Sequence, residues 1–397
     1  MDENHSDHNP EWQKDYSLEW GTIMHIEFYR HNIDEDDIKR VNQVLRSIFL
    51  TTGDQVKEFE DQLAVYLGVK YAVGLTSCTA ALHLSLLACG VSPGDEVITT
   101  PMTFIATANA ILHTGAKPVF VDVEPDTANI DASLIEAAIT SHTKAILPVH
   151  LYGQLCDMRT IREIADKYNL YIIEDAAHCL EGIREGIRPG QLGDVACFSF
   201  YATKSITSGE GGAIATNSPD IAERVKLLRL HGMSKNAADR YIKRYEHWDM
   251  IECGWKYNMD NIQAALLIGQ LGRTDSLCQR REEIAYRYEK AFDNIPGLDF
   301  ARIKPGYNKS SRHLFTIWVA PEKRDKILYD IQERNIGVAV NYRAIHLLSY
   351  FRHEFEFARG IFPIAEKIGD STISIPLYSS LSDIEVDYII KSVIEVI

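Results

Sequence analysis

The sequence predicts an α/β protein with a large domain, built on a seven-stranded and mostly parallel sheet between helices, and a smaller α+β domain at the C-terminal end. Two observations support this fold class. Between about residues 70 and 216, short runs of β-forming residues alternate with helical segments, and several runs are apolar throughout, as in strands covered on both faces. At 397 residues the chain is also too long for one small core.

The first elements precede the sheet. Residues 1–20 are polar, and we expect them to form a flexible tail outside the fold. Apolar positions at helical spacing predict one helix from Asp34 to Leu50, with an acidic residue near its start. A second helix is predicted from Val56 to Leu67, and it ends at Gly68.

Seven strands follow, with helices between the earlier ones. The predicted strands are 71–75, 96–100, 118–123, 145–150, 171–174, 195–200 and 212–216, and the predicted helices are 79–89, 105–113, 133–139 and 158–168. A long helix is predicted from Met259 to Arg287. We expect the large domain to comprise residues 21–270 and the small one residues 271–397, with strands 314–320 and 338–342 and helices near 325–335 and 382–396.

Charge and cysteine content exclude several classes. A formal net charge of −15 without a basic stripe argues against nucleic acid as a partner, although a pocket for an anionic small molecule remains possible. The 7 scattered cysteines form no Cys-x-x-Cys pair, which favours buried free thiols in a reducing compartment over disulfides or a metal site. No apolar signal region or membrane-length run is present, so we expect a cytoplasmic protein.

The stretch from Val195 to Gly212 is the best candidate for an active loop. A strand-forming run ends in a polar segment that carries Lys204, followed by three glycines and a second apolar run. At the edge of a packed sheet, burial can lower the pKa of an ammonium group enough to make it a nucleophile toward an aldehyde. The alternative is that Lys204 is a solvated turn residue.

Two further positions carry polar groups at the ends of predicted strands. The first strand leads to Thr79 and Ala80, where free N–H groups at a helix start favour a phosphate; the alternative is ordinary N-capping by Ser77 or Thr79. Asp175 follows an apolar strand, where α/β sheets bind ligands, but it could instead cap a helix. His178 could be functional or a packing residue.

Together these residues match the needs of pyridoxal 5'-phosphate. This cofactor requires a lysine for its aldehyde, a carboxylate for its pyridinium nitrogen and donors for its phosphate. A dehydrogenase is disfavoured, because the first strand lacks the glycine fingerprint of dinucleotide-binding folds. A non-catalytic regulator that senses the cofactor or a sugar is a further alternative, although no basic DNA-binding helix is visible.

Five motifs extend this match to a family resemblance. Residues 94–109 (GDEVITTPMTFIATAN), 174–178 (EDAAH), 198–204 (FSFYATK), 209–212 (GEGG) and 254–259 (GWKYNM) resemble the nucleotide-sugar aminotransferases of the DegT type. These are pyridoxal-phosphate enzymes of fold type I, and the resemblance runs from about Ile26 to the C-terminus. Some members carry a histidine instead of the lysine and deoxygenate their substrate, which Lys204 argues against here.

The resemblance implies a role for each matching residue of the cofactor site. Lys204 would bind the cofactor aldehyde and move protons, and Asp175 would contact the pyridinium nitrogen. Phe104 would stack on the ring, and His178 would lie near the ring hydroxyl. The phosphate would be held by Thr79, Ala80 and Ser199.

The resemblance also implies a homodimer with shared active sites. Asn258 resembles the residue that reaches the phosphate from the neighbouring subunit; its alternative is to N-cap the following helix. Lys256, Tyr342 and His346 match regions on the side of the nucleotide, and each could instead be a surface residue.

The implied reaction moves an amino group from an amino acid donor, L-glutamate in most of the family, to a keto sugar linked to a nucleotide in amino-sugar biosynthesis. Tyr257-Asn-Met-Asp260 resembles the members that act at C4 more than those that act at C3. A 3-keto sugar or a cyclitol ketone is the alternative acceptor for the same chemistry.

Overall fold

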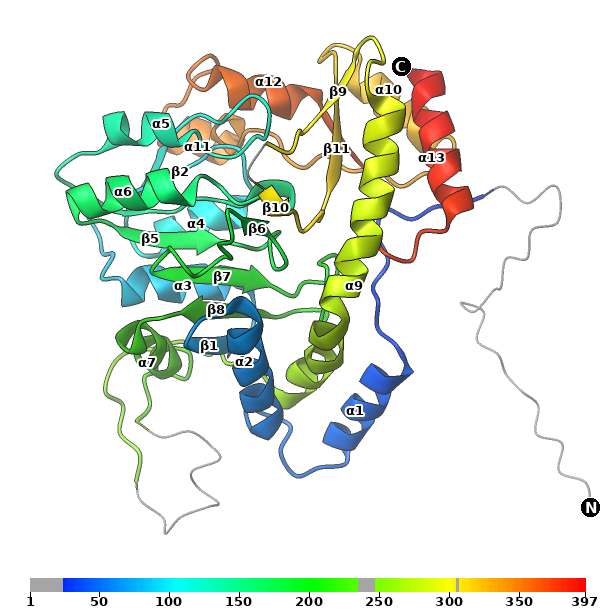
Figure 1. Ribbon diagram of the computed structural model, residues 1–397. Helices are drawn as coiled ribbons and strands as arrows, with labels where there is room; N and C mark the ends of the chain where they lie inside the picture. The colour runs from blue at the N-terminus through cyan, green and yellow to red at the C-terminus, as the bar shows by residue number, and fades with distance from the viewer. Residues whose placement is uncertain (1–23, 235–246, 305–306) are drawn as a thin grey trace, which may run out of the picture.

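The computed structural model describes residues 24–234, 247–304 and 307–397, and a seven-stranded sheet lies between helices in its larger part (Figure 1). The strands are β1 (Tyr71–Leu75), β2 (Glu96–Thr99), β3 (Lys117–Phe120), β4 (Thr143–Ile146), β5 (Tyr171–Asp175), β7 (Val195–Ser199) and β8 (Gly212–Thr216). Their order is β1-β8-β7-β5-β4-β2-β3, and β8 is antiparallel to both neighbours while the other pairs are parallel. The predicted sheet is therefore confirmed, and the predicted tail lies outside the described residues.

Helices cover both faces of this sheet. On one face lie α3 (Cys78–Ala88), α4 (Ile105–His113) and α7 (Pro219–Leu228), and on the other lie α2 (Asp54–Leu67), α6 (Met158–Tyr168) and the first half of α9 (Asn261–Phe292). Neighbouring residues of a strand face opposite layers: Val73 packs with α3, and Ala72 packs with α2. Burial on both faces explains why several strands are apolar throughout.

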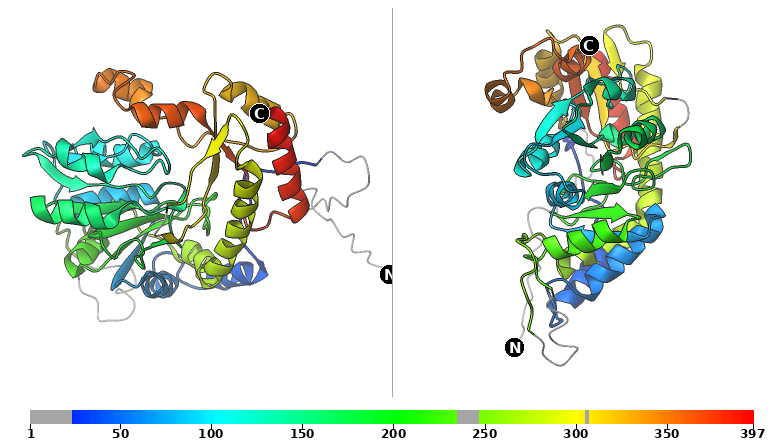
Figure 2. Two further views of the ribbon diagram at one scale, coloured as in Figure 1. Left: turned by 45° about the horizontal axis from the view of Figure 1, so that its top comes forward. Right: turned by 90° about the vertical axis from the view of Figure 1, so that its left-hand side faces the viewer.

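The C-terminal part packs beside the second half of α9 (Figure 2). Strands β9 (Leu298–Phe300), β11 (Phe315–Val319) and β12 (Thr372–Ile375) form an antiparallel sheet of order β12-β11-β9, which packs with α10 (Arg324–Gln332) and α13 (Asp383–Val396). Ile26, near the N-terminal end of the described chain, joins the same apolar core. Because α9 continues without a break through residue 270, the domain boundary placed there stays a prediction.

The remaining elements are short. They are α1 (Glu35–Leu45), α5 (Ala132–Ile135), α11 (Ser349–Glu354), α12 (Pro363–Ser371), the two-stranded sheet of β6 (Ile183–Arg184) and β10 (Tyr307–Lys309), and three 3₁₀ turns at 136–138, 151–153 and 345–347. All seven cysteines are free, and six of them are buried, as predicted. Among the described helices, none combines the length and the hydropathy needed to cross a lipid bilayer.

The predicted strand from Val338 to Tyr342 is wrong. Only Ala339 forms a bridge, to Ser374 of β12. The chain then leaves the small sheet, because Tyr342 belongs to the lining of a cavity and bonds to a histidine of the large domain. Period-two alternation could not distinguish this path from a strand.

Several helix ends also differ from the prediction. α1 ends at Leu45, and Ile48, expected on its apolar face, is 88% exposed. α9 begins two residues later than predicted, because Asp260 and Gln263 form a capping box at its start. The predicted helix at 133–139 divides into α5 and a 3₁₀ turn.

Candidate active site

One cavity of about 580 Å³ brings together most of the predicted site residues. It lies at the carboxyl ends of β5 and β7, and its volume falls within the range of about 300–1,000 Å³ that is usual for small-molecule sites. The predicted residues that line it are Thr79, Phe104, Asp175, His178, Ser199, Lys204 and Tyr342.

Lys204 lies in the connection between β7 and β8, which pair with each other. The pair Ser199–Gly212 ends the ladder, and Phe200 donates a backbone hydrogen bond to the carbonyl of Gly211 (2.9 Å), so both ends of the loop are fixed. Lys204 is half-buried and reaches the cavity, where surrounding protein desolvates its amine. Burial lowers the pKa of Lys204 to about 8, against the attraction of Cys78 and Asp175. This environment favours the interpretation of Lys204 as a nucleophile over its interpretation as a solvated turn residue.

The lowered pKa predicts how the cofactor-free protein responds to pH. Below about 8 the amine of Lys204 is mostly protonated, and above that value it is mostly neutral and can attack an aldehyde. At pH 7 the neutral fraction is about 300-fold larger than for a lysine with an ordinary pKa. We expect the rate of binding pyridoxal phosphate, followed by absorbance, to rise tenfold per pH unit and to level off near pH 8. A rise that continues toward pH 10 would contradict the assigned environment.

Asp175 ends β5 and points its carboxylate into a buried polar setting. Its Oδ2 accepts a hydrogen bond from Thr107 Oγ1 (2.8 Å), and its Oδ1 accepts one from the backbone N–H of Ala177 (3.1 Å). Burial raises the pKa of Asp175, while these two donors and the charge of Lys204 oppose the rise. No helix begins directly after Asp175, so the helix-cap alternative is wrong.

Three aromatic side chains from distant parts of the chain meet at the cavity. The hydroxyl of Tyr342 lies 3.1 Å from Nε2 of His178, and the rings of Tyr342 and Phe104 are 5.8 Å apart. Burial lowers the pKa of His178 well below its usual value, so the ring is neutral at pH 7. Its Nδ1 is buried without a hydrogen-bond partner. Phe104 is 54% exposed, which leaves a ring face free for a planar ligand.

The amino end of α3 forms another wall of the cavity. Ser77 is the N-cap, and its Oγ accepts a hydrogen bond from the N–H of Ala80 (3.1 Å), while Thr79 lines the cavity. The capping alternative is therefore realised by Ser77. Gly212 of β8 lets this helix end approach, because a Cβ there would lie 2.3 Å from the carbonyl carbon of Ser77 and 2.5 Å from the nitrogen of Cys78.

The Gly212→Ala variant is therefore expected to displace the amino end of α3. Its methyl group would meet backbone atoms that cannot rotate away, so we expect unfolding free energy to fall by about 1–3 kcal/mol. Affinity for pyridoxal phosphate should fall at the same time, which titration by fluorescence would measure. The matched control is Gly272→Ala, because a Cβ at Gly272 of α9 would meet no atom within 4 Å and Gly272 does not line the cavity. Equal cofactor affinity in the two variants would contradict the expected displacement.

Four predicted residues do not line this cavity, namely Ala80, Lys256, Asn258 and His346. Asn258 accepts a hydrogen bond from Lys256 and donates one to Thr52 Oγ1 (2.7 Å); it does not cap α9, whose N-cap is Asp260, so that alternative is wrong. His346 is buried, and its Nε2 lies 3.1 Å from Glu366 Oε1. Ala80 contributes its backbone at the helix end and is also absent from the lining.

Two residues of the site were not identified from the sequence. Thr107 donates to Asp175 from the third position of α4, within a motif in which only Phe104 had an assigned role. His313 places its Nε2 3.4 Å from Nζ of Lys204. No local pattern marks His313, because its role depends on a contact between residues more than a hundred positions apart.

The cavity fits pyridoxal phosphate by the chemistry of its donors. It offers a desolvated amine at Lys204, a buried carboxylate at Asp175 and, at His178, a buried nitrogen without a partner. The amino end of α3 stands beside Thr79, where a phosphate would find N–H groups and a favourable helix dipole.

The chain is similar to known proteins over almost its whole length. The sequence profile described as the DegT/DnrJ/EryC1/StrS aminotransferase family matches residues 31–394. The spore coat polysaccharide biosynthesis protein SpsC of Bacillus subtilis is 42% identical over 374 residues, covering 92% of this chain and 95% of that protein. The UDP-4-amino-4-deoxy-L-arabinose–oxoglutarate aminotransferase of Shewanella sediminis is 36% identical over 377 residues, covering 93% and 97%.

A solved structure extends the similarity to the fold. Spr1654 from Streptococcus pneumoniae, in its PMP form, superposes with a TM-score of 0.88 at 35% identity, covering 94% of this chain and 98% of that one. The same protein has also been solved in a PLP form. With a profile match over nearly its whole length and close relatives of matching length, the chain belongs to the DegT/DnrJ/EryC1/StrS aminotransferase family.

Proposed function

We propose that the protein uses pyridoxal phosphate to transfer an amino group from L-glutamate to the C4 keto group of a nucleotide-linked sugar in amino-sugar biosynthesis. The observation that carries this proposal is the cavity that joins Lys204, Asp175 and the amino end of α3. The name of the Shewanella relative contains a 4-amino sugar nucleotide and oxoglutarate, the keto acid that remains when glutamate gives up its amino group. The 36% sequence identity of this relative to the chain supports both C4 as the position that receives the amino group and glutamate as the amino donor.

The residues of the cavity would divide the work of holding the cofactor. Asp175 would accept a hydrogen bond from the ring nitrogen, and Phe104 would cover a ring face. Thr79, Ala80 and Ser199 would hold the phosphate, and His178 would lie at the ring hydroxyl. Thr107 and the N–H of Ala177 keep the carboxylate of Asp175 oriented.

The chemistry then divides between cofactor and protein. Pyridoxal phosphate, when bound, supplies an aldehyde that accepts the amino group and a ring that stabilises a carbanion. Nζ of Lys204 takes the proton from the α-carbon of glutamate in the first half-reaction and delivers a proton to the sugar carbon in the second. The negative charge of Asp175 favours a protonated ring nitrogen. Phe104 and Tyr342 line the cavity and, with the cofactor bound against Phe104, would reduce the access of water to the reacting atoms.

We propose further that the protein acts as a homodimer in the cytoplasm. Asn258 and Lys256 bond to each other and do not line this chain's cavity, which is compatible with their serving the site of a second subunit. The free, mostly buried cysteines are compatible with a reducing compartment. Sedimentation velocity at micromolar concentration should give a dimer or a higher oligomer, and a monomer would contradict the shared site.

The function is tested with absorbance spectra of the purified protein. Glutamate should convert the spectrum of the bound pyridoxal form to that of the pyridoxamine form, and a 4-keto sugar nucleotide should reverse the change. A 3-keto sugar nucleotide and a cyclitol ketone are tested in parallel, and reversal by one of these alone would move the proposal to that substrate. If no amino donor changes the spectrum, or no pyridoxal phosphate binds, catalysis is excluded and a sensing role takes its place.

A further inference from the structure

Among the described residues, His313 forms a hydrogen bond with the amine of Lys204. It lies between β10 and β11, its Nε2 is 3.4 Å from Nζ, and its ring packs on that of His178 with centroids 4.3 Å apart. The other titratable groups that interact with Lys204 are Asp175, Cys78 and His178. None of these forms a hydrogen bond with Nζ among the described residues, so His313 is the group placed to orient the amine.

The protonation state of His313 suits this contact. Burial lowers the pKa of His313 well below its usual value, and the positive charges of Lys204 and Arg281 act in the same direction. At pH 7 the ring is therefore neutral, and its Nε2 can accept a hydrogen bond from the lysine amine when the proton of the ring is on Nδ1. The ring of the neighbouring His178 is neutral at pH 7 as well, because burial also lowers its pKa.

A buried ion pair holds the backbone directly before His313. Arg281 of α9 donates to the carbonyl of Ser311 through Nε (3.2 Å) and through one terminal nitrogen (3.1 Å), which also donates to Glu181 Oε1 (2.6 Å). The N–H of Glu181 in turn donates to Ser311 Oγ (3.0 Å). The side chains of Arg281 and Glu181 are only 3% and 0% exposed. Ser311 is therefore bonded through both its backbone and its side chain.

A second set of charges fixes the next residue. Arg312 has a left-handed backbone with φ +45°, and its guanidinium donates to both carboxylate oxygens of Glu282 (2.6 and 3.0 Å) and to Glu289 (2.7 Å). Gly153 lies directly beneath, because a Cβ there would be 2.8 Å from the nitrogen of Arg312. The carbonyls of Tyr152 and Gly153 accept the N–H groups of His313 and Ser311 at 3.2 and 2.9 Å. Hydrogen bonds and the close approach of Gly153 therefore fix the backbone that leads into His313.

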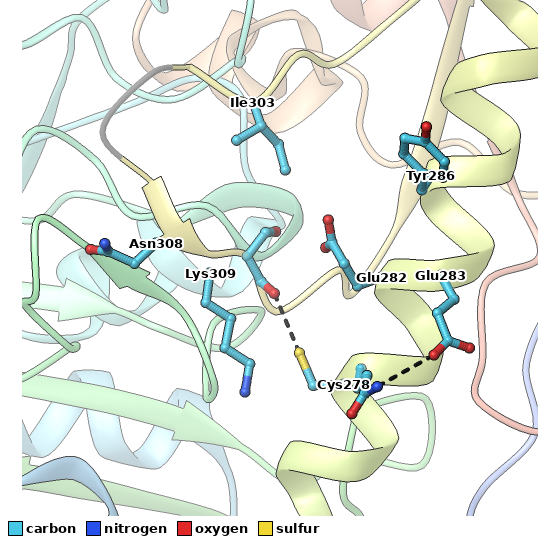
Figure 3. A pocket seen from close by; sticks show the side chains of 9 residues that line it. Cys278, Glu282, Glu283, Tyr286, Ile303, Asn308 and Lys309 are labelled. Carbon is cyan, nitrogen blue, oxygen red and sulfur yellow. Dashed lines mark hydrogen bonds between the residues drawn. The ribbon is translucent and has the colours of Figure 1, made fainter.

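The outer side of the same segment is anchored to α9. Cys278 of α9 donates its thiol hydrogen to the carbonyl of Ser310 (3.3 Å). Figure 3 shows Cys278 and Glu282 on this helix, where both line one pocket. These side chains belong to an open cavity of about 550 Å³, separate from the cavity of Lys204. Ser310 lines this outer cavity, and side chains of α9 bond to the segment at Ser310, Ser311 and Arg312.

Stability alone is a poor explanation for this arrangement. Buried ion pairs seldom stabilise a fold more than apolar side chains of similar volume would, because desolvation offsets their attraction. What they provide here is one fixed position for four consecutive residues. We propose that His313 is the positioning residue of Lys204, which accepts a hydrogen bond from the amine and fixes Nζ in the cavity, and that Arg281 and Arg312 serve to hold His313 there. The inference deepens the proposed function and rests on it.

The test compares two replacements of His313 with a control. His313→Gln keeps a neutral acceptor near the position of Nε2, and His313→Leu removes it. His83→Leu is the matched control, because His83 is also buried, makes no hydrogen bond through its ring nitrogens and lies outside the cavity lining. Each protein is converted by glutamate to the pyridoxamine form, in which Lys204 is free, and trace acetylation of Lys204 is measured by mass spectrometry from pH 6 to 10.

An acceptor stabilises the protonated amine, so its loss should lower the midpoint of acetylation. We expect His313→Leu to shift the midpoint down by about one pH unit, and His313→Gln and His83→Leu to keep the wild-type midpoint. With α-deuterated glutamate, His313→Leu should also slow the single-turnover conversion about tenfold or more, with a larger isotope effect and an unchanged KM. A general loss of packing would lower thermal stability without these changes.

The proposal is overturned if wild type, His313→Leu and His313→Gln share one midpoint and one isotope effect. If His313→Leu does not fold, His313→Asn replaces it, because the shorter asparagine side chain cannot place an acceptor at the position of Nε2. His313→Asn should then lower the midpoint of acetylation, while His313→Gln should not. Failure of the proposed function gives a different result, because glutamate would then leave even the wild-type spectrum unchanged.

Discussion

The Lys204→Ala variant should bind pyridoxal phosphate through the remaining contacts and lose amino transfer. Asp175 and the amino end of α3 do not depend on the lysine, so cofactor affinity should fall without being abolished. Without an amine at this position, no described group in the cavity can take the α-proton of glutamate at neutral pH, because Asp175 is committed to two donors and His178 to Tyr342. We expect turnover to fall at least about 1,000-fold.

Stopped-flow absorbance with glutamate measures this loss, and a small alkylamine added to the variant provides a sharper check. If the missing group is the amine alone, the alkylamine should restore part of the conversion in proportion to its concentration of neutral form. Lys167→Ala is the control, because this lysine is exposed on α6 and pairs with Glu136 at the surface. Full activity of Lys204→Ala would refute the assignment of the site.

The Asp175→Asn variant should fold normally and lose about 100-fold or more in turnover. An asparagine oxygen can still accept from Thr107 or Ala177, so the local structure has a replacement for the carboxylate. A neutral amide, however, cannot stabilise a positive charge that develops beside it in a site from which water is excluded, and losses of this size follow when such a partner is removed. The first half-reaction with glutamate should slow by the same factor as overall turnover.

The matched control for this variant is Asp166→Asn, which removes a carboxylate that is 69% exposed on α6. It should retain wild-type rates and cofactor affinity. If Asp175→Asn retained rates near those of wild type, the carboxylate would have only a structural role, and the ring nitrogen would have to be held elsewhere. Circular dichroism and the thermal midpoint distinguish a fold defect from the expected chemical one.

The large sheet was predictable because its signal is local. Each strand is a short apolar run between turn residues, and burial on both faces leaves this pattern intact in Val195–Ser199 and Gly212–Thr216. Strand order and the antiparallel direction of β8 are set by packing between distant segments, which no window of sequence contains. The strand wrongly predicted at Val338–Tyr342 shows the same limit, since its course is decided by a contact of Tyr342 with His178.

The site residues were predictable from the sequence where a single local motif supplies each functional group. Asp175 ends a strand, and Lys204 and Thr79 each follow one, so their meeting at the carboxyl edge follows from a parallel sheet. His313 reaches the same place from the C-terminal part through Arg281 and Arg312, whose partners are spread over the chain. His346 resembled a substrate contact, whereas in the structure its hydrogen bond to Glu366 keeps it in the core.

The position of β1 at the edge of the sheet has a consequence for the order of folding. β1 pairs with β8 alone, and Tyr71 of β1 lies opposite Thr216 of β8. During synthesis β1 therefore has no strand partner until the ribosome has made the chain between these two residues, which takes roughly ten seconds. Only then does the amino end of α3 meet Gly212 and the loop of Lys204. Nascent chains shorter than about 216 residues should be unable to retain pyridoxal phosphate, and ligand capture should stabilise the final product of synthesis.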